Sequence, residues 1–239
     1  MRRGKRYEVI FFDMDGTLID SLRDISTAVN FTLKKMGLGQ IEDEVVRLFV
    51  GSGLNALIEA TFREEGMRCT PRVLKQARKH FEKFYWRHCT DETCWYPHVV
   101  PALKKLVGKR RLVVFTNKPQ PFAEKILRAL KGEPFFEEVI AAIGGEPRKP
   151  DPKAALELLQ KWGVGRTDAL LVGDSLIDRD TARRGRFDFA LVDHGFSKIP
   201  PGERKKIRYR FKTFSSLQRW IRESSRRGRT RRPRSRGHR

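Results

Sequence analysis

Apolar residues are distributed along this chain in two patterns. Short continuous runs bounded by turn residues are typical of strands buried on both faces, whereas apolar positions that recur every three or four residues are typical of amphipathic helices. The continuous runs predict strands over residues 9–12, 111–115, 136–141, 169–172, 187–192 and 207–211.

After residue 96, helical patterns separate these predicted strands. Strands that alternate with helices predict a parallel sheet with right-handed crossover connections. The fold class that we predict is therefore α/β, with a Rossmann-like parallel sheet as its core. The helices of this part are expected over residues 99–107, 119–130, 152–162, 178–184 and 215–221.

Residues 20–95 differ from the rest of the chain, because only helical spacing is evident there. At the start of the first helix Ser21 offers an N-cap, and Asp24, three residues later, offers its capping-box partner. We therefore predict an all-helical cap domain over residues 20–95, inserted into a core domain formed by residues 1–19 and 96–223. The four helices of this cap are expected over residues 22–36, 42–49, 54–65 and 72–88.

The composition is that of a folded protein without a membrane segment. The 239 residues are 39% hydrophobic, which is enough for a core domain and an insert, and no apolar run approaches the roughly eighteen residues that a membrane helix requires. The basic start at residues 2–6 is followed by an apolar stretch too short for a signal peptide. Three cysteines form no disulfide framework and fit a reducing compartment, so we expect a cytoplasmic protein.

The net charge is strongly positive, +22, and the densest stretch of positive charge is C-terminal. Residues 224–239 contain eight arginines and no acidic residue, so removing their charge leaves +14 for the rest of the chain. Because this segment has nothing to bury, we expect it to be a disordered basic tail. A positive field attracts phosphorylated or nucleic-acid partners. No nucleic-acid-binding motif is present, so we expect nucleic acid to bind only non-specifically, through the tail.

Two acidic residues follow the first predicted strand. Asp13 and Asp15 come directly after residues 9–12, and Gly16 then breaks the extended chain. Side chains two positions apart lie on the same side of an extended segment. The two carboxylates therefore project together from the carboxyl end of a strand, where open α/β sheets bind ligands. Like charges held together require a cation or a shared proton, and hard oxygen ligands of this kind suit Mg²⁺.

Other polar residues are expected at the same edge of the sheet. Thr116 and Asp174 each follow a predicted strand, and Lys149 precedes a predicted helix. Taken singly, Thr116 is typical of a strand end and Lys149 of a solvated loop. Together with the two acids they match the parts of a phosphoryl-transfer site. Such a site uses a carboxylate nucleophile, a carboxylate acid/base, a hydroxyl, an ammonium and acidic metal ligands.

In order and at suitable spacing, these segments resemble the four motifs of the haloacid dehalogenase superfamily. The resemblance spans about residues 7–222, and within the superfamily the chain is most similar to the phosphoglycolate phosphatases. The four motif segments are Asp13-Met14-Asp15-Gly16-Thr17, Thr116, Lys149 and Gly173-Asp174-Ser175-Leu176-Ile177-Asp178. The similarity to phosphoglycolate phosphatases is carried by Asp20-Ser21 with Asp24, and by residues 49–53, 116–119 and 149–152.

The resemblance implies a role for each motif residue. Asp13 resembles the nucleophile that becomes an aspartyl-phosphate, and Asp15 resembles the acid that protonates the leaving group and then activates water. Thr116 would hold a phosphoryl oxygen, and Lys149 would neutralise charge on the nucleophile and the phosphate. Asp174, with Asp13 and the backbone carbonyl of Asp15, would bind Mg²⁺.

The remaining candidate residues support this set. Asp178 would support the metal site or orient the motif lysine. Thr17 and Asn117 are candidate substrate-binding residues, as are Gly51 and Gly53 of the cap. The backbone N–H groups of this glycine loop are able to meet an anion, although a plain turn between two helices explains both glycines equally well.

The resemblance implies a Mg²⁺-dependent phosphatase that hydrolyses a small phosphate monoester, with 2-phosphoglycolate as the expected substrate. Its partner would be a small phosphorylated metabolite, and no membrane partner is expected. A dehalogenase would lack the second acid, so Asp15 favours a phosphatase. An inorganic pyrophosphatase or a nucleotidase shares all four motifs and stays an alternative. From another class, the charge of +22 leaves a nucleic-acid-binding protein on a phosphatase scaffold as an alternative.

Overall fold

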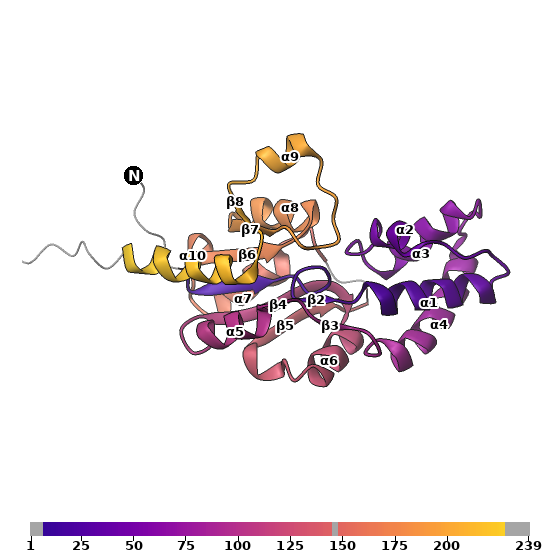
Figure 1. Ribbon diagram of the computed structural model, residues 1–239, viewed down its shortest axis with the longest axis horizontal. Helices are drawn as coiled ribbons and strands as arrows, with labels where there is room; N and C mark the ends of the chain where they lie inside the picture. Colours follow the sequence, from indigo (N-terminus) through magenta and orange to yellow (C-terminus); the bar gives the residue numbers. More distant parts are fainter. Residues whose placement is uncertain (1–6, 145–147, 228–239) are drawn as a thin grey trace, which may run out of the picture.

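The computed structural model describes residues 7–144 and 148–227, and a six-stranded parallel sheet lies at its centre (Figure 1). The strands are β1 (Val9–Phe12), β4 (Arg111–Pro119), β5 (Glu138–Ala142), β6 (Ala169–Gly173), β7 (Asp188–Val192) and β8 (Tyr209–Phe211). Their order across the sheet is β5-β4-β1-β6-β7-β8, and every pair is parallel. The predicted α/β class is confirmed.

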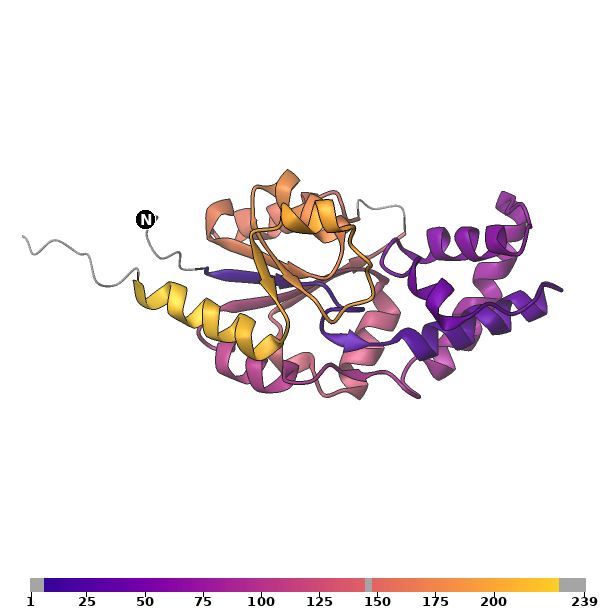
Figure 2. The ribbon, with the colours of Figure 1, turned by 45° about the horizontal axis from the view of Figure 1, so that its top comes forward.

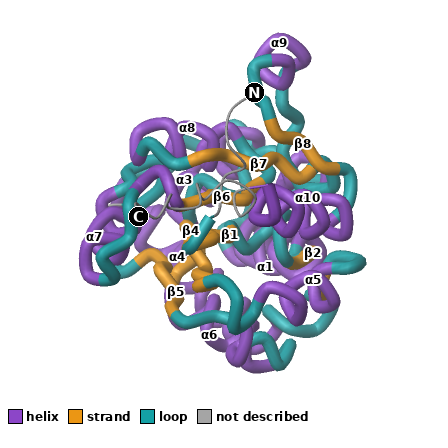
Figure 3. The backbone as a smooth tube through the Cα atoms, turned by 90° about the vertical axis from the view of Figure 1, so that its left-hand side faces the viewer, coloured by secondary structure: helices purple, strands orange, loops and turns teal. Residues whose placement is uncertain are grey.

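Strand β1 occupies the middle of the sheet because it is apolar on both faces. Its four residues are fully buried. Ile10 and Phe12 belong to the hydrophobic cluster on one face, and Val9 and Phe11 belong to the cluster on the other. Two layers of helices therefore enclose the sheet (Figure 3). The first layer contains α5 (Val99–Leu106), α6 (Gln120–Ala129) and α10 (Phe214–Arg227), and the second contains α7 (Lys153–Lys161) and α8 (Leu176–Gly185).

The four helices predicted for residues 20–95, which we call the helical insertion, are present. They lie together at one end of the molecule, opposite the far end of α10 (Figure 1, Figure 2). No helix in the described ranges is long and apolar enough to cross a membrane. The insertion contains α1 (Leu22–Lys35), α2 (Asp43–Arg47), α3 (Leu54–Glu64) and α4 (Pro71–His88).

The prediction that residues 20–95 contain only helices is wrong at the two ends of the insertion. There β2 (Ile19–Asp20) and β3 (Cys94–Trp95) pair as a two-stranded antiparallel sheet. Strands of two residues are too short for an alternating pattern to show in the sequence. This small sheet joins the points where the chain enters and leaves the helical insertion.

The predicted capping box at the start of α1 is also wrong. Ser21 is the N-cap residue, but its hydroxyl donates to Oδ1 of Asp15 at 2.5 Å and caps no helical N–H. The carboxylate of Asp24 instead accepts hydrogen bonds from the backbone N–H groups of Glu92, at 3.0 Å, and Thr93, at 2.9 Å. Asp24 is almost fully buried, and a buried carboxylate takes the donors that the tertiary structure brings to it.

The C-terminal helix is longer than predicted. Helix α10 continues to Arg227, so the first four residues of the predicted disordered tail are helical. Leu217 and Ile221 anchor the helix in the core, and the sequence has no helix breaker between Ile221 and Gly228. The remainder of the predicted tail, residues 228–239, lies outside the described residues. A short helix that no pattern predicted, α9 (Pro201–Lys205), precedes β8.

Candidate active site

The first acidic motif continues strand β1 at the centre of the sheet edge. The backbone N–H of Asp13 donates to the carbonyl of Val172 in β6 at 2.9 Å, so the strand pairing extends to the first acid. The chain reaches β4 on one side of β1 and β6 on the other. This point, where the strand order reverses, is where open α/β sheets bind ligands.

Lys149 joins two buried acids of different motifs. Its Nζ lies 2.6 Å from Oδ1 of Asp13 and 2.6 Å from Oδ1 of Asp178. The second oxygen of Asp178 accepts from the hydroxyl of Ser175, at 2.6 Å, and from its backbone N–H, at 3.1 Å, the latter as part of a capping box at the start of α8. The local helix cap thus fixes the carboxylate of Asp178, and this carboxylate positions Lys149. Such a geometry is expected of a residue that orients the motif lysine.

Asp174 directly follows strand β6 and is held by a loop that the sequence did not indicate. Its Oδ2 accepts from the backbone N–H groups of Phe196, at 2.8 Å, and Ser197, at 3.1 Å. A Cβ at Gly195 would lie 2.2 Å from the Cβ of Asp174, so only glycine fits there. A glycine shortly after strand β7 was the one available signal for this loop.

One oxygen each from Asp13, Asp174 and Asp178 lies within 4.8 Å of the others. Burial raises the pKa of Asp13 well above its usual range, although Lys149 opposes that shift, and it raises the pKa of Asp174 to about 6. Three buried carboxylates and one ammonium leave two uncompensated negative charges. A divalent cation with oxygen ligands matches this cluster in charge and in donor type. From the sequence, Asp178 was expected to support the metal site without binding the ion. In the structure its carboxylate lies with those of Asp13 and Asp174.

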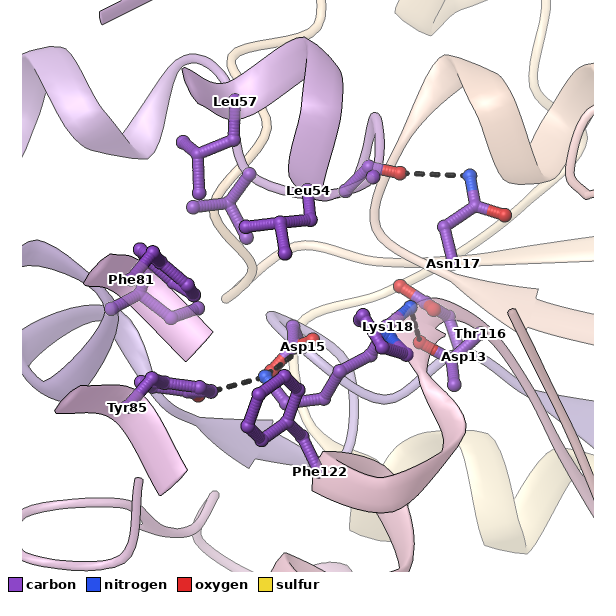
Figure 4. Close-up of a pocket in the computed structure, with 15 residues that line it drawn as sticks. Asp13, Asp15, Leu54, Leu57, Phe81, Tyr85, Thr116, Asn117, Lys118 and Phe122 are labelled. Carbon is purple, nitrogen blue, oxygen red and sulfur yellow. Dashed lines mark hydrogen bonds and ion pairs between the residues drawn. The ribbon is translucent and has the colours of Figure 1, made fainter. Parts of the chain in front are cut away.

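Asp15 points away from this cluster, toward the helical insertion. The Nζ of Lys118, at the end of β4, lies 2.9 and 3.2 Å from the two oxygens of Asp15 and 2.8 Å from the hydroxyl of Tyr85 in α4 (Figure 4). Lys118 is buried. No role was predicted for Lys118 or Tyr85. The signals for Lys118 were its position two residues after Thr116, at the same edge of the sheet, and its place in the segment 116–119 that resembles the phosphoglycolate phosphatases.

Thr116 and Asn117 lie beside these residues. The hydroxyl of Thr116 accepts the backbone N–H of Lys118 at 3.1 Å. The amide nitrogen of Asn117 donates to the carbonyls of Gly51 and Lys149, each at 3.0 Å, so this side chain ties the helical insertion to the loop that carries Lys149 (Figure 4). The oxygen Oδ1 of Asn117 is buried and has no partner among the described residues.

Of the other predicted substrate-binding residues, the two glycines line the cavity and Thr17 does not. Gly51 and Gly53 border the same cavity as Asn117. A Cβ at Gly53 would lie 2.5 Å from Nη1 of Arg148, and Gly53 has φ +90°, so glycine is required there. Thr17 is fully buried, and its hydroxyl lies 3.4 Å from Oδ1 of Asp174, away from the cavity.

A partly open cavity of about 50 Å³ lies between the strand ends and the helical insertion. This volume holds a few water molecules. One side of the cavity is polar and the other is apolar. Its polar residues are Asp13, Asp15, Thr116, Asn117 and Lys118, and its apolar wall contains Ile25, Leu54, Leu57, Phe81 and Phe122.

A second contact holds the helical insertion closed. Arg47 of α2 donates from Nη2 to the carbonyl of Gly195, at 2.9 Å, and from Nε to the carbonyl of Phe196, at 3.1 Å. These carbonyls belong to the loop whose N–H groups bind Asp174. The insertion is thus anchored to both sides of the site, through Asn117 on β4 and through the loop after β7.

Comparison with known proteins agrees with this geometry. Residues 10–192 match the family described as haloacid dehalogenase-like hydrolase. The phosphoglycolate phosphatase of Aquifex aeolicus strain VF5 is 33% identical over 196 residues, which cover 80% of this chain and 87% of the relative. The N-acetylmuramic acid 6-phosphate phosphatase of Pseudomonas aeruginosa is 28% identical over 193 residues, covering 80% and 84%. The crystal structure of a predicted phosphoglycolate phosphatase from Haemophilus somnus 129PT has a TM-score of 0.83 at 26% identity, covering 89% of this chain and 97% of the other.

The family match includes every motif residue, from Asp13 directly after β1 to Asp178 in α8. The structural likeness covers the sheet and the helical insertion together. The predicted resemblance to the superfamily is confirmed. This chain belongs to the haloacid dehalogenase-like hydrolase family.

Proposed function

We propose that the protein is a Mg²⁺-dependent phosphatase that hydrolyses 2-phosphoglycolate to glycolate and phosphate. The observation that carries this proposal is the ion pair of Asp13 with Lys149 beside two further buried carboxylates, with Asp15 facing a small cavity. This set supplies a nucleophile, its electrostatic partner and a separate acid/base. The substrate follows from the curated relatives named phosphoglycolate phosphatase.

In the proposed first step a carboxylate oxygen of Asp13 attacks phosphorus, and the bond between phosphorus and the leaving oxygen breaks. Asp15 gives its proton to that oxygen, and glycolate leaves. In the second step Asp15 takes a proton from water, whose oxygen attacks the phosphorus of the aspartyl-phosphate and releases Asp13. Lys149 neutralises charge on Asp13 and on the phosphoryl oxygens, and the hydroxyl of Thr116 donates to one of those oxygens.

The acidic cluster fits Mg²⁺ in charge and in ligand chemistry. Asp13 and Asp174, with the backbone carbonyl of Asp15, would hold the ion, and Asp178 would complete its surroundings. When bound, Mg²⁺ supplies positive charge to the phosphoryl oxygens as negative charge develops on them.

The helical insertion acts in this proposal as a cap domain that excludes water and selects the leaving group. Its apolar side chains Leu54, Leu57 and Phe81 form one wall of the cavity. The cavity between the strand ends and the insertion is small, about 50 Å³. We expect it to favour a two-carbon leaving group over the larger leaving groups of nucleotides and sugar phosphates.

A substrate panel tests this assignment. We expect kcat/KM for 2-phosphoglycolate to exceed the values for pyrophosphate, nucleoside monophosphates and N-acetylmuramic acid 6-phosphate by about tenfold or more, since one misfitting group costs that much. A competitor that exceeds 2-phosphoglycolate by a similar factor would overturn the substrate and keep the phosphatase. Absence of Mg²⁺-dependent hydrolysis of every ester would overturn both.

The pH dependence of stability tests the metal site separately. The pKa of Asp174, about 6, lies above the value of 3.8 for an ordinary aspartate. Between these values the folded metal-free protein holds a proton that the unfolded chain has released, so its free energy of unfolding falls as pH rises from about 4 to about 6. Because Mg²⁺ displaces this proton, the stabilisation by Mg²⁺ should grow across the same range.

The measurement is the thermal midpoint with saturating Mg²⁺ and with K⁺ at equal ionic strength, at both ends of this pH range and at neutral pH. We expect the difference between the two cations to increase with pH and then to level off. A difference that is zero throughout, or one that shrinks as pH rises, would contradict the assignment of the metal site.

A further inference from the structure

We propose that Lys118 and Tyr85 form a subsite that binds a carboxylate on the leaving group and so selects small phosphate monoesters with an anionic leaving group. This inference rests on the proposed phosphatase function and adds the residues that decide its specificity. Both side chains border the cavity next to Asp15 (Figure 4).

Lys118 is a buried cation that lines the cavity. Its side chain is 4% exposed, and its Nζ makes hydrogen bonds only to Asp15 and Tyr85 among the residues that the structure describes. Asp15 holds the pKa of Lys118 well above its ordinary value in spite of burial, so the side chain stays charged. A buried ion pair contributes little to stability by comparison with apolar packing. A charged donor at the wall of the cavity, beside Asp15, is instead well placed to bind an anionic group.

The position of Lys118 in the cavity suits an anionic ligand. Its Nζ lies beside the carboxylate of Asp15, and the apolar side chains of Leu54 and Leu57 line the same cavity. A carboxylate on the leaving group would bring the ammonium a partner of opposite charge, whereas a neutral leaving group offers none.

The distances fit a short acid. Asp15 must lie within hydrogen-bonding distance of the leaving oxygen, and the Nζ of Lys118 lies 2.9 Å from the same carboxylate. In 2-phosphoglycolate the carboxylate carbon is two bonds from the leaving oxygen, so its charge falls next to Lys118. A carboxylate farther along a longer leaving group would pass Lys118 and meet the apolar wall.

Tyr85 supplies the second donor. Its hydroxyl oxygen accepts from Lys118 at 2.8 Å, and no acceptor for the hydroxyl proton is present in the described part of the chain. Burial raises the pKa of Tyr85, so the proton is retained. Because Tyr85 belongs to α4 of the helical insertion, the subsite is complete only when the insertion lies over the strand ends. Recognition of the carboxylate is thus coupled to closure of the cavity.

The test compares 2-phosphoglycolate with 2-phosphoglycolamide, which has the same size and no charge on its leaving group. We expect the wild-type protein to prefer the carboxylate, and Lys118→Met to lower the ratio of the two kcat/KM values by about 100-fold, as expected for a buried hydrogen bond between charged groups. The ratio is the readout because Lys118 also touches Asp15, so the absolute rates fall for both esters.

Tyr85→Phe is the milder variant, because it leaves the pair of Lys118 and Asp15 in place. It should lower the same ratio by about tenfold and weaken inhibition by glycolate without changing inhibition by orthophosphate. The control is Lys125→Met, which removes a lysine charge from the neighbouring helix α6, where Lys125 lies over the ring of Trp86. This control should leave the ratio and both inhibition constants unchanged.

The outcomes separate this inference from the function on which it rests. A wild-type protein that hydrolyses both esters equally well, or a Lys118→Met variant that keeps the wild-type ratio, overturns the subsite and leaves the phosphatase standing. A wild-type protein that hydrolyses neither ester overturns the proposed function itself. If Lys118→Met does not fold, Tyr85→Phe decides alone, and an unchanged ratio in that variant rejects the subsite.

Discussion

Replacement of Asp13 by asparagine should lower kcat for phosphate-ester hydrolysis by about 10⁴-fold or more, the scale on which removal of a catalytic nucleophile acts. An amide oxygen cannot attack phosphorus as a carboxylate does. The variant should still fold, because the amide oxygen is able to accept the hydrogen bond from Lys149 that Asp13 accepts at 2.6 Å. Removing one of three clustered carboxylates also relieves repulsion in the metal-free protein.

Steady-state rates with excess Mg²⁺ and the thermal midpoint test this expectation together. The matched control is Asp168→Asn, the same chemical change at the opposite, amino end of strand β6, which should keep the wild-type rate. An Asp13→Asn protein that retains a tenth of the wild-type activity would show that Asp13 is not the nucleophile.

Replacement of Asp174 by asparagine should weaken Mg²⁺ binding and lower kcat/KM by about 10²–10³-fold, since a metal ligand contributes several kcal/mol to stabilisation of the transition state. Asparagine is preferable to alanine here. Its amide oxygen is able to keep the hydrogen bonds from Phe196 and Ser197, so that the loop after β7 stays in place. High Mg²⁺ concentration should restore part of the activity.

The measurement is activity as a function of Mg²⁺ concentration, with EDTA as the zero point. Asp180→Asn is the control, because Asp180 lies on the same helix as Asp178 but pairs with Arg179 outside the cluster. Wild-type activity that persists in EDTA, or a variant with an unchanged Mg²⁺ dependence, would contradict the assignment of Asp174.

The carboxyl edge of the sheet was predictable for two physical reasons. A continuous apolar run such as residues 9–12 is stable only between two helical layers, so β1 had to be central. Parallel strands then carry their carboxyl ends to one edge, which brings Asp13, Thr116 and Asp174 together without any knowledge of distances. Local order in the chain and one rule of topology were sufficient for this part of the site.

The capping box at α1 shows where local patterns fail. The spacing of Ser21 and Asp24 matches a helix start, and the pattern is correct for an isolated helix. In the folded protein Asp24 binds Glu92 and Thr93, 68 and 69 residues away, and Ser21 binds Asp15. Polar side chains in a buried junction take partners from the fold, and spacing along the chain carries no information about them.

The amino-acid sequence by itself determined the α/β class, the position of β1, the motif carboxylates and the helical insertion, because each of these depends on local apolar periodicity or on short spacing. Only the tertiary structure decided the rest. It paired Lys118 with Asp15 and Tyr85, joined Asp174 to the loop after β7, and formed a cavity of about 50 Å³. These contacts unite residues from separate strands, loops and helices, and their partners are set by how the helical insertion packs against the sheet.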